Sequence, residues 1–482
     1  MTTEDTYRSS IRDNLNRTLD SAFIPEFGAP KHGKVRDIYF VGGKVVMVAS
    51  DRVSAFDHVL SRRIPFKGAV LNAFNQWAME NTTDIIRNAT LANPDPNVIV
   101  QERMENVGFE FVVRGHVWGS LAADYEGGKR IKSGILLPEG LLRYQPLPEP
   151  LFTPTTKAEK GHDEDVTLDD IVRVHGSERA HKMRDASVAL FRRGQELALR
   201  GGMVLIDTKF ELGFDDAMGG LYLIDECLTP DSSRYVRDTE HAAKFASIQE
   251  LMQTGTWKDV SALLKERPDL KITEASKQFV RDVLIQGGYK DGQPLPELTD
   301  DQVVETAWRY IQTYEQLTGR TFDFGRSDLP TVGKRIMNNL VKAGLAYGGC
   351  VVPIGASEND NGHWEKLEKG LKDAGIPYTK PFFASAHRET DKVLAFVREM
   401  DRTSLEPLVY LTFAGRSNGL GPVVAGNTTN PVITCPVFSD VTSYSVDIHS
   451  SLRMPSKLPL MTVIDPSNAA LAVKRILDLA RN

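Results

Sequence analysis

Acidic and basic side chains alternate within one apolar stretch of the chain, GGMVLIDTKFELG. Single residues separate Asp207, Lys209 and Glu211, and this spacing is typical of a β-strand that carries all three charges on one face. A turn-rich segment, FDDAMGG, leads to a second apolar run, Leu221 to Ile224, which ends at Asp225. We therefore predict a β-hairpin with a glycine-closed loop.

Two carboxylates of this hairpin have the spacing of a metal site. With the loop centred near Ala217, Glu211 and Asp225 are diagonal neighbours on one face, with Cβ atoms about 7–8 Å apart or less. Two ionised carboxylates at that distance repel each other unless a cation lies between them. A few oxygen ligands with room left for phosphate suit Mg²⁺. The alternative is a surface hairpin in water, against which the flanking apolar runs argue.

The two halves of this hairpin, DTKFELG and DECLTPDSSR, resemble the signature of the SAICAR synthetase family, which joins aspartate to a carboxyaminoimidazole ribotide with ATP. The resemblance implies that Glu211 and Asp225 hold magnesium and that Asp225 also belongs to the ATP site. It implies ribotide binding by Lys209 and Arg234. Lys209 and Asp207 are the catalytic residues that it implies.

Two earlier segments extend the same resemblance. In KHGKVRDIY, a glycine and alternating cations lie between two predicted strands and are able to cover a polyphosphate, although basic hairpins are also common on solvated surfaces. The resemblance assigns Gly33, Lys34 and Arg36 to ATP, and the chain has no Walker A pattern. In VVRGHVWGS, it implies that Arg114 and Ser120 bind the ribotide.

Secondary candidates lie in two further segments. SDRVSAFD contains Asp51 and Asp57, which the resemblance places along the substrate cleft, although both are also typical of turn or cap positions. The proline-rich PEPLFTPTTKAEKGHDE cannot form a helix or a central strand and contains the candidates Lys157 and His162. We expect His116 to be structural.

The last third of the chain alternates short apolar runs with helices, which is typical of a parallel, doubly wound sheet. Three predicted strands lead into GASEND, SAHR and AGRSNGLGP. Such sheets bind phosphorylated ligands where strand ends meet helix starts. His387 lies at one of these ends beside a cation, and histidine is well suited to move a proton near neutral pH. A structural histidine is the alternative.

SAHR, AGRSNGLGP and the tail SSLRMPS resemble the aminoimidazole ribotide (AIR) carboxylase family, in the branch that takes CO₂ directly. The resemblance implies that His387 transfers the proton, without biotin. It implies ribotide binding by residues of the strand-end loops, namely Ser357, Asp360, Ser385, Arg388, Gly415, Arg416 and Asn418. Two departures are Ala356, which lengthens the phosphate loop by one residue, and Val437, which stands where the family has a second proline.

Length and composition fit a globular protein of several domains. The 482 residues are 41% hydrophobic and 25% charged, with a net charge of −6, which gives no electrostatic reason to expect nucleic acid or an anionic membrane as a partner. No apolar run reaches the roughly 18 residues of a membrane span, and the polar N-terminus fits neither a signal nor a transit peptide. Three cysteines without CxxC spacing indicate a reducing, cytoplasmic location.

The expected fold class is α/β, with an α+β N-terminal part. Residues 1–320 are predicted to form a two-lobed, ATP-grasp-like SAICAR-synthetase fold, with lobes of about residues 1–112 and 113–320. Residues 321–347 are predicted as a linker. Residues 348–482 are predicted as a doubly wound, three-layer α/β/α, flavodoxin-like carboxylase domain.

The two resemblances support each other, because the carboxylase product is the synthetase substrate. Together they imply a bifunctional enzyme of purine biosynthesis that uses aminoimidazole ribotide, CO₂, L-aspartate, ATP and Mg²⁺ and forms a homo-octamer through its C-terminal domain. Two alternatives remain. The C-terminal domain is a mutase or a non-catalytic assembly module, or the N-terminal part is another ATP-dependent ligase or phosphotransferase of the same fold.

Overall fold

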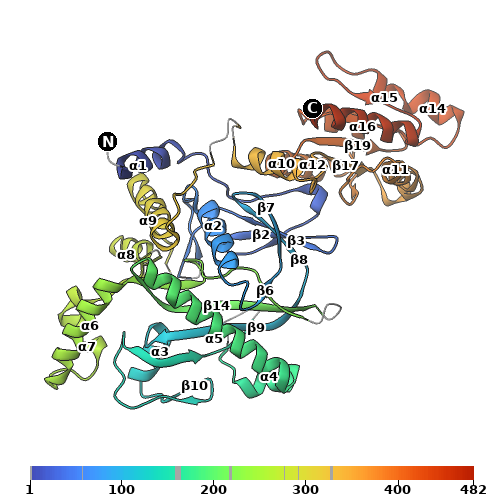
Figure 1. Cartoon of the computed structure of the whole chain (residues 1–482). Helices are drawn as coiled ribbons and strands as arrows, with labels where there is room; N and C mark the ends of the chain where they lie inside the picture. Colours follow the sequence, from blue (N-terminus) through green and yellow to red (C-terminus); the bar gives the residue numbers. More distant parts are fainter. Residues whose placement is uncertain are drawn as a thin grey trace. The chain divides into compact units, whose positions relative to one another are not determined.

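The computed structural model describes the whole chain except for residues 1–2, 57, 158–163, 216–219, 276, 291–292, 326–328, 330 and 482. The chain divides into two compact units (Figure 1). The first comprises residues 1–20, 34–36 and 42–326, and the second comprises residues 21–33, 37–41 and 327–482.

The larger sheet of the first unit has the strand order β12-β9-β14-β15-β6. Its central strands, β9 (Glu105–His116) and β14 (Met203–Asp215), run antiparallel. β14 pairs antiparallel with β15 (Gly220–Ile224), which confirms the predicted hairpin. The remaining strands of this sheet are β6 (Arg87–Asn88), β12 (Pro146–Phe152), β13 (Thr155–Thr156) and β16 (Ser233–Arg237). The proline-rich β12 lies at the sheet edge, as its missing N–H donors require.

Helix α5 (Ser177–Arg200) packs on β14. Its buried face includes Leu190, Phe191 and Leu197, which belong to the core of this unit. Gly176 is both the last capping residue of α4 (Leu168–His175) and the first capping residue of α5. Gly176 has a φ of 79°, which only glycine adopts at little cost.

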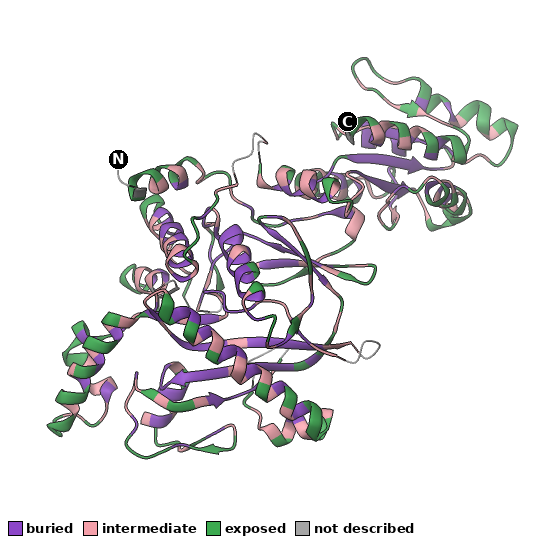
Figure 2. Ribbon diagram, viewed as in Figure 1, coloured by how far each residue is buried: buried purple, intermediate pink, exposed green. Residues whose placement is uncertain are grey.

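A second layer of helices closes the core. On α9 (Asp300–Thr318), an apolar stripe is buried in the core and comprises Trp308, Ile311, Tyr314 and Leu317. α9 packs against α1 (Thr3–Asp13) and α2 (Lys67–Glu80), and Figure 2 shows the buried side of these helices. The other helices are α3 (Gly119–Glu126), α6 (Asp238–Gln253), α7 (Val260–Glu266) and α8 (Lys277–Gln286).

A smaller sheet of the first unit contains the antiparallel strands β3 (Lys44–Ala49), β8 (Val98–Glu102) and β7 (Thr90–Asp95). Short hairpins join β4 (Ser54–Ala55) to β5 (His58–Val59) and β10 (Ile131–Lys132) to β11 (Ile135–Leu136). The two sheets give the first unit the mixed α and β character that was predicted. The predicted lobe boundary at residues 112 and 113 cuts through the continuous strand β9.

The sheet of the second unit is parallel throughout and has the order β18-β17-β19-β20-β21. In chain order this is 2-1-3-4-5, the flavodoxin-like arrangement. The strands are β17 (Cys350–Gly355), β18 (Phe382–Phe383), β19 (Leu408–Phe413), β20 (Val432–Thr434) and β21 (Met461–Thr462). The predicted doubly wound sheet is confirmed.

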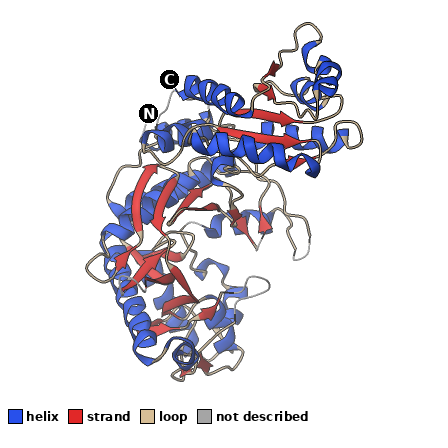
Figure 3. Cartoon of the chain, turned by 90° about the vertical axis from the view of Figure 1, so that its right-hand side faces the viewer, coloured by secondary structure: helices blue, strands red, loops and turns tan. Residues whose placement is uncertain are grey.

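Helices cover both faces of this sheet, so it forms the middle of three layers (Figure 3). Along β19, Tyr410 faces the cluster that contains α12 (Thr390–Thr403) and α13 (Leu420–Ala425), whereas Leu411 faces the cluster that contains α11 (Asn361–Asp373) and α16 (Pro466–Arg481). Strands buried on both faces read as continuous apolar runs, which explains the sequence VYLTF. Two short helices, α14 (Val441–Asp447) and α15 (His449–Leu452), follow β20.

The second unit extends beyond the predicted carboxylase segment. The predicted linker, residues 321–347, contains the helix α10 (Val332–Lys342), which buries Ile336 and Leu340. The hairpin of β1 (Lys31–His32) and β2 (Arg36–Val41) lies largely in this unit. Leu405 donates its backbone N–H to the Phe23 carbonyl at 2.9 Å. The domain bounds at residues 320 and 348 remain a prediction.

Among the helices of the described residues, none combines the length and apolarity that crossing a membrane would need.

Candidate active sites

The predicted metal ligands come together by a different geometry from the one expected. Glu211 pairs with Ile224, so the diagonal pairing with Asp225 is wrong by one residue. In this register a continued strand would turn Asp225 to the opposite face. However, β15 ends at Ile224 and Asp225 has a φ of 58°, which redirects its side chain. Burial and then the Glu211 charge raise the pKa of Asp225, so the two carboxyls interact.

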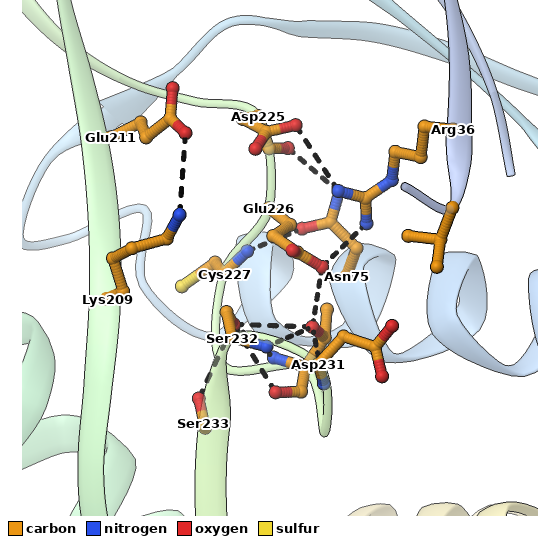
Figure 4. A network of polar contacts seen from close by, with 12 residues as sticks. Arg36, Asn75, Lys209, Glu211, Asp225, Glu226, Cys227, Asp231, Ser232 and Ser233 are labelled. Atoms are coloured by element: carbon orange, nitrogen blue, oxygen red, sulfur yellow. Dashed lines mark hydrogen bonds and ion pairs between the residues drawn. The ribbon is translucent and has the colours of Figure 1, made fainter. Parts of the chain in front are cut away.

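Arg36 joins the acidic end of this hairpin (Figure 4). Its buried guanidinium lies 3.3 Å from Asp225 Oδ1 and 2.7 Å from Glu226 Oε2. Burial alone would lower the pKa of Arg36, but the two carboxylates raise it. Glu226 also accepts a hydrogen bond from Thr229 Oγ1 at 2.6 Å. The predicted ATP-binding residues Arg36 and Asp225 therefore lie in direct contact.

Lys209 and Glu211 bring a second cation and acid to the same place. Lys209 Nζ lies 2.6 Å from Glu110 Oε1 and 3.9 Å from Glu211 Oε1. Burial opposes the charge of Lys209, yet these carboxylates raise its pKa above the ordinary value. Glu211 also contacts Lys157 and accepts a hydrogen bond from Asn106 Nδ2 at 3.1 Å. The candidate Lys157 thus belongs to this site.

The donor set of this site fits a magnesium ion. Glu211 and Asp225 supply carboxylate oxygens, and their mutual repulsion is part of what raises the pKa of Asp225. A divalent cation would remove that repulsion, and Mg²⁺ accepts one or two carboxylates together with substrate phosphates. In the described residues no group of three or more His, Cys, Asp or Glu residues forms a complete metal site. Water and phosphate would have to complete the coordination of an ion here.

Asp207 lies between two arginines on flanking strands. Both Arg114 of β9 and Arg234 of β16 stand opposite Asp207 of β14 in the strand register. Arg234 Nε donates to Asp207 Oδ1 at 2.7 Å and its Nη2 contacts Oδ2, while Arg114 Nη1 lies 3.3 Å from Oδ2. One carboxylate therefore carries two guanidiniums, which leaves net positive charge for an anionic ligand.

The start of α3 borders this pair of arginines. Gly119 has a φ of 56°, and a Cβ atom added there would lie 2.4 Å from Arg234 Nη1. Ser120 is exposed in the first turn of α3. The predicted ribotide residues Arg114, Ser120 and Arg234 are thus grouped around Asp207 and the α3 start.

His116 is structural, as expected. It is buried, with its ring centroid 5.0 Å from that of His241. Burial and then the neighbouring imidazole lower its pKa to about 4. It is therefore a neutral core residue near pH 7.

The remaining candidates of the first part of the chain are less central. Asp51 is buried and accepts the backbone N–H groups of Leu19 and Gly68, which is a structural role. Lys34 is exposed before β2, and Gly33 lies in the hairpin between β1 and β2. Two candidates, Asp57 and His162, lie outside the described residues.

In the second unit, three loops follow the carboxyl ends of neighbouring strands. After β17, the Ser357 side chain accepts the Asn359 N–H at 3.2 Å. A Cβ atom added at Gly415, after β19, would lie 4.0 Å from Asp360 Oδ1, so these two loops adjoin. Burial raises the pKa of Asp360. The additional residue Ala356 donates its N–H to the Phe413 carbonyl at 3.1 Å, so it continues the pairing of β17 with β19.

His387 lies in the loop after β18 and faces the loop after β19. Its Nε2 lies 3.3 Å from Ser417 Oγ, and a Cβ atom added at Gly419 would lie 3.3 Å from the same nitrogen. Ser385 is buried, whereas Arg388 is exposed. Gly415 and Arg416 line a cavity of about 480 Å³ together with residues of α14, and Asn418 is fully buried beneath the loop. The structure therefore gathers the predicted carboxylase residues at the strand ends.

Several site residues were not predicted. Glu110 stands opposite Glu211 on β9, and this strand pairing has no local sequence signal. Glu226 follows Asp225 directly, so the pair of consecutive acidic residues was the sequence feature that could have indicated Glu226 as a site residue. Lys67 has a fully buried side chain whose Nζ lies 2.8 Å from Asp231 Oδ2. That ion pair anchors the turn that precedes Arg234.

Two protein families match this chain. Residues 30–251 match the SAICAR synthetase family, and residues 350–482 match the AIR carboxylase family. A phosphoribosylaminoimidazole-succinocarboxamide synthase of Cytophaga hutchinsonii is 41% identical over 315 residues, which are 64% of this chain and 94% of that protein.

Solved structures of similar proteins cover both parts. SAICAR synthase from Saccharomyces cerevisiae, complexed with SAICAR, is 25% identical with a TM-score of 0.53, and the match covers 64% of this chain and all of that one. Treponema denticola PurE is 39% identical over 27% of this chain and 81% of its own, with a TM-score of 0.26.

Proposed function

Because this chain belongs to the SAICAR synthetase family and carries an AIR carboxylase domain after it, we propose that its two sites catalyse consecutive steps. The chain is a bifunctional enzyme of purine biosynthesis, a carbon–nitrogen ligase in its first part and a carboxylase in its second. The carboxylated ribotide made by the second part is the compound that the first part joins to L-aspartate with ATP.

The single observation that carries the ligase assignment is the pair of guanidiniums on Asp207. Arg114 and Arg234 flank that carboxylate, and guanidinium is the group that best binds carboxylate and phosphate. We assign the ribotide to these two arginines, together with Ser120 and Lys209. Asp207 holds the arginines in place, which is how it would contribute to catalysis.

ATP would bind beside the acidic end of the hairpin. Gly33, Lys34 and Arg36 are the residues that we assign to its phosphates, together with Asp225. Glu211 and Asp225 would hold Mg²⁺, which when bound supplies positive charge to the phosphates. Lys209, whose pKa is raised by its acidic neighbours, stays protonated and would offset negative charge on the reacting carboxylate.

The ligation proceeds in two displacements. A carboxylate oxygen of the ribotide attacks the γ-phosphorus of ATP, the bond to the β-phosphate oxygen breaks, and ADP leaves. The amine of aspartate then attacks the acyl carbon, and inorganic phosphate leaves with the oxygen that came from the carboxylate. The amine proton passes to solvent or to a nearby base.

An isotope experiment tests this route. With ribotide whose carboxylate carries ¹⁸O, the phosphate released should contain one ¹⁸O atom per turnover, and its formation should require aspartate. Phosphate without label would exclude attack by the carboxylate. Release of ADP at the same rate without aspartate would favour a phosphotransferase.

For the carboxylase, we propose direct use of CO₂. Ring C4 of aminoimidazole ribotide attacks CO₂, a carbon–carbon bond forms, and His387 removes the C4 proton so that the ring regains aromaticity. Ser357, Asp360, Ser385 and Arg388 would hold the ribotide with the loop that contains Gly415, Arg416 and Asn418. Biotin has no part in this proposal.

The assembly and location are proposals as well. Exposed apolar side chains lie on α14 and α15, with Val441 82%, Val446 64% and Leu452 59% exposed. Such residues favour burial against another copy, which supports self-association through the second unit, and we propose that the assembly is a homo-octamer. Light scattering of the purified protein would measure its mass. We propose a cytoplasmic location, because three buried, unpaired cysteines suit a reducing compartment.

A further inference from the structure

The turn after β19 has a backbone that must be held by other groups. Ser417 and Asn418 are consecutive non-glycine residues with positive φ angles of 63° and 41°. A left-handed backbone conformation is unfavourable for a residue that has a Cβ atom. Two such residues in sequence therefore need compensating contacts.

Those contacts come from α14 and α15. Asp447, the last residue of α14, accepts the Ser417 backbone N–H on Oδ1 at 2.8 Å. Ser451 of α15 is 2% exposed, and its hydroxyl contacts the side-chain nitrogen of Asn418, Nδ2. Asn418 Oδ1 also accepts from Thr434 Oγ1 at 3.3 Å. Both strained residues are thus fixed by groups more than 15 positions away in the chain.

The turn in this form presents a hydroxyl to the proposed proton carrier. Ser417 Oγ lies 3.3 Å from His387 Nε2, and Gly419 approaches the same nitrogen. A hydroxyl both donates and accepts. Ser417 is therefore able to donate to a neutral imidazole and to accept from a protonated one, so the contact survives the proton transfer.

We propose that Asp447 is a positioning residue of the carboxylase site, which fixes the Ser417 amide and thereby holds the Ser417 hydroxyl against His387. This inference rests on the proposed role of His387. It gives a function to the segment between β20 and β21, which the sequence analysis matched to a family only through SSLRMPS. Asp447 lines the cavity beside Gly415 and Arg416, and its Oδ1 accepts the Ser417 N–H, so the role assigned to it is orientation of the turn.

The effect expected of a positioning residue is on turnover more than on substrate binding. Asp447→Ala should lower carboxylase kcat about ten-fold, because a small loss of alignment is costly, and should change KM for aminoimidazole ribotide less than about three-fold. Asp447→Asn keeps an amide oxygen that accepts the Ser417 N–H, so it should restore most of the lost kcat. In a Ser417→Ala background, Asp447→Ala should cost much less than it does in the wild type.

The controls lie in the same chain. Ser445→Ala on the same helix removes an exposed hydroxyl that donates to the Thr442 carbonyl, and it should leave kcat unchanged. Ligation of supplied carboxylated ribotide to aspartate should be unchanged in every variant, which reports on the fold of the first unit.

Three results would overturn the assignment. They are unchanged kcat in Asp447→Ala, an equal loss in Asp447→Asn, or a rise in KM alone. The variant His387→Asn distinguishes a failure of the proposed His387 role from a failure of the Asp447 role alone. If it carboxylates normally, the proposed role of His387 fails and the inference fails with it. If it is inactive while Asp447→Ala keeps full kcat, only the role of Asp447 is wrong.

Discussion

Arg234 and Asp207 are joined by two hydrogen bonds across neighbouring strands, with Arg234 Nε 2.7 Å from Asp207 Oδ1. The pairing is bidentate, which fixes the plane of the guanidinium as well as its position. Because Asp207 also binds Arg114, it supports both arginines of the anion site that we propose for the ligase.

Arg234→Lys tests the shape of that site. An ammonium keeps the charge but cannot make the bidentate pair, so kcat/KM of ligation for the carboxylated ribotide should fall about ten-fold or more. Carboxylation should not change. Steady-state kinetics of both activities measure the effect, and a lysine variant with unaltered ligation would show that the planar contact is unimportant.

Glu211→Ala and Asp225→Ala test the proposed metal site. Each should lower ligation at least about a hundred-fold, because charge on the transferred phosphoryl group is no longer offset, and should leave carboxylation intact. Glu105→Ala is the matched control, since Glu105 is an exposed acid on β9. Loss of both activities in a variant would point to misfolding, and normal ligation would remove the residue from the mechanism.

The hairpin shows how far the sequence predicts this site. Alternation along β14 placed Asp207, Lys209 and Glu211 on one strand correctly. The register was missed by one residue, because loop geometry decides register and a single-residue shift preserves the alternation. Asp225 still interacts electrostatically with Glu211, and its left-handed backbone is one that no pattern of residue types predicts. Glu110 was missed because pairing between β9 and β14 is a tertiary contact.

The variant His387→Asn tests the carboxylase site, and it should impair carboxylation while leaving ligation intact. Without a side chain that takes up a proton, carboxylation should fall about 10²–10⁴-fold, while ligation of supplied carboxylated ribotide should continue at the wild-type rate. The decisive readout is incorporation of labelled bicarbonate into the ribotide. A variant that carboxylates normally would exclude His387 from proton transfer.

We predict that Glu406 makes the stability of the second unit depend on pH. It is 4% exposed, its Oε1 accepts the Glu26 N–H at 2.7 Å, and burial followed by the Glu26 charge raises its pKa from 4.5 to about 9. Between these values the folded protein holds a proton that the unfolded chain has released. The free energy of unfolding therefore falls as pH rises, by at most about 1.4 kcal/mol per pH unit.

Glu406→Gln should remove this dependence. The amide oxygen still accepts the Glu26 N–H, but the side chain no longer ionises. Thermal unfolding between pH 6 and pH 9 should show a steeper loss of stability in the wild type than in the variant. Parallel curves for the two proteins would contradict the shifted pKa.

The second unit was easier to predict than the first. Its strands are buried on both faces and its loops follow strand ends, so local patterns agree with the tertiary fold. The helix α10 within the predicted linker was missed because the charged and glycine residues near its start resemble a linker. The N-cap Thr331 and the helical spacing of Ile336, Met337 and Leu340 were the available signals. The role of α14 and α15 also appears only in the folded structure.

The most direct test of the account follows the absorbance of purified protein with aminoimidazole ribotide and bicarbonate, first alone and then after addition of ATP, Mg²⁺ and aspartate. We predict that carboxylated ribotide forms in the first stage and is consumed to SAICAR in the second. No product in the first stage, with turnover only when carboxylated ribotide is supplied, would contradict the claim that both units are active and that CO₂ is used directly.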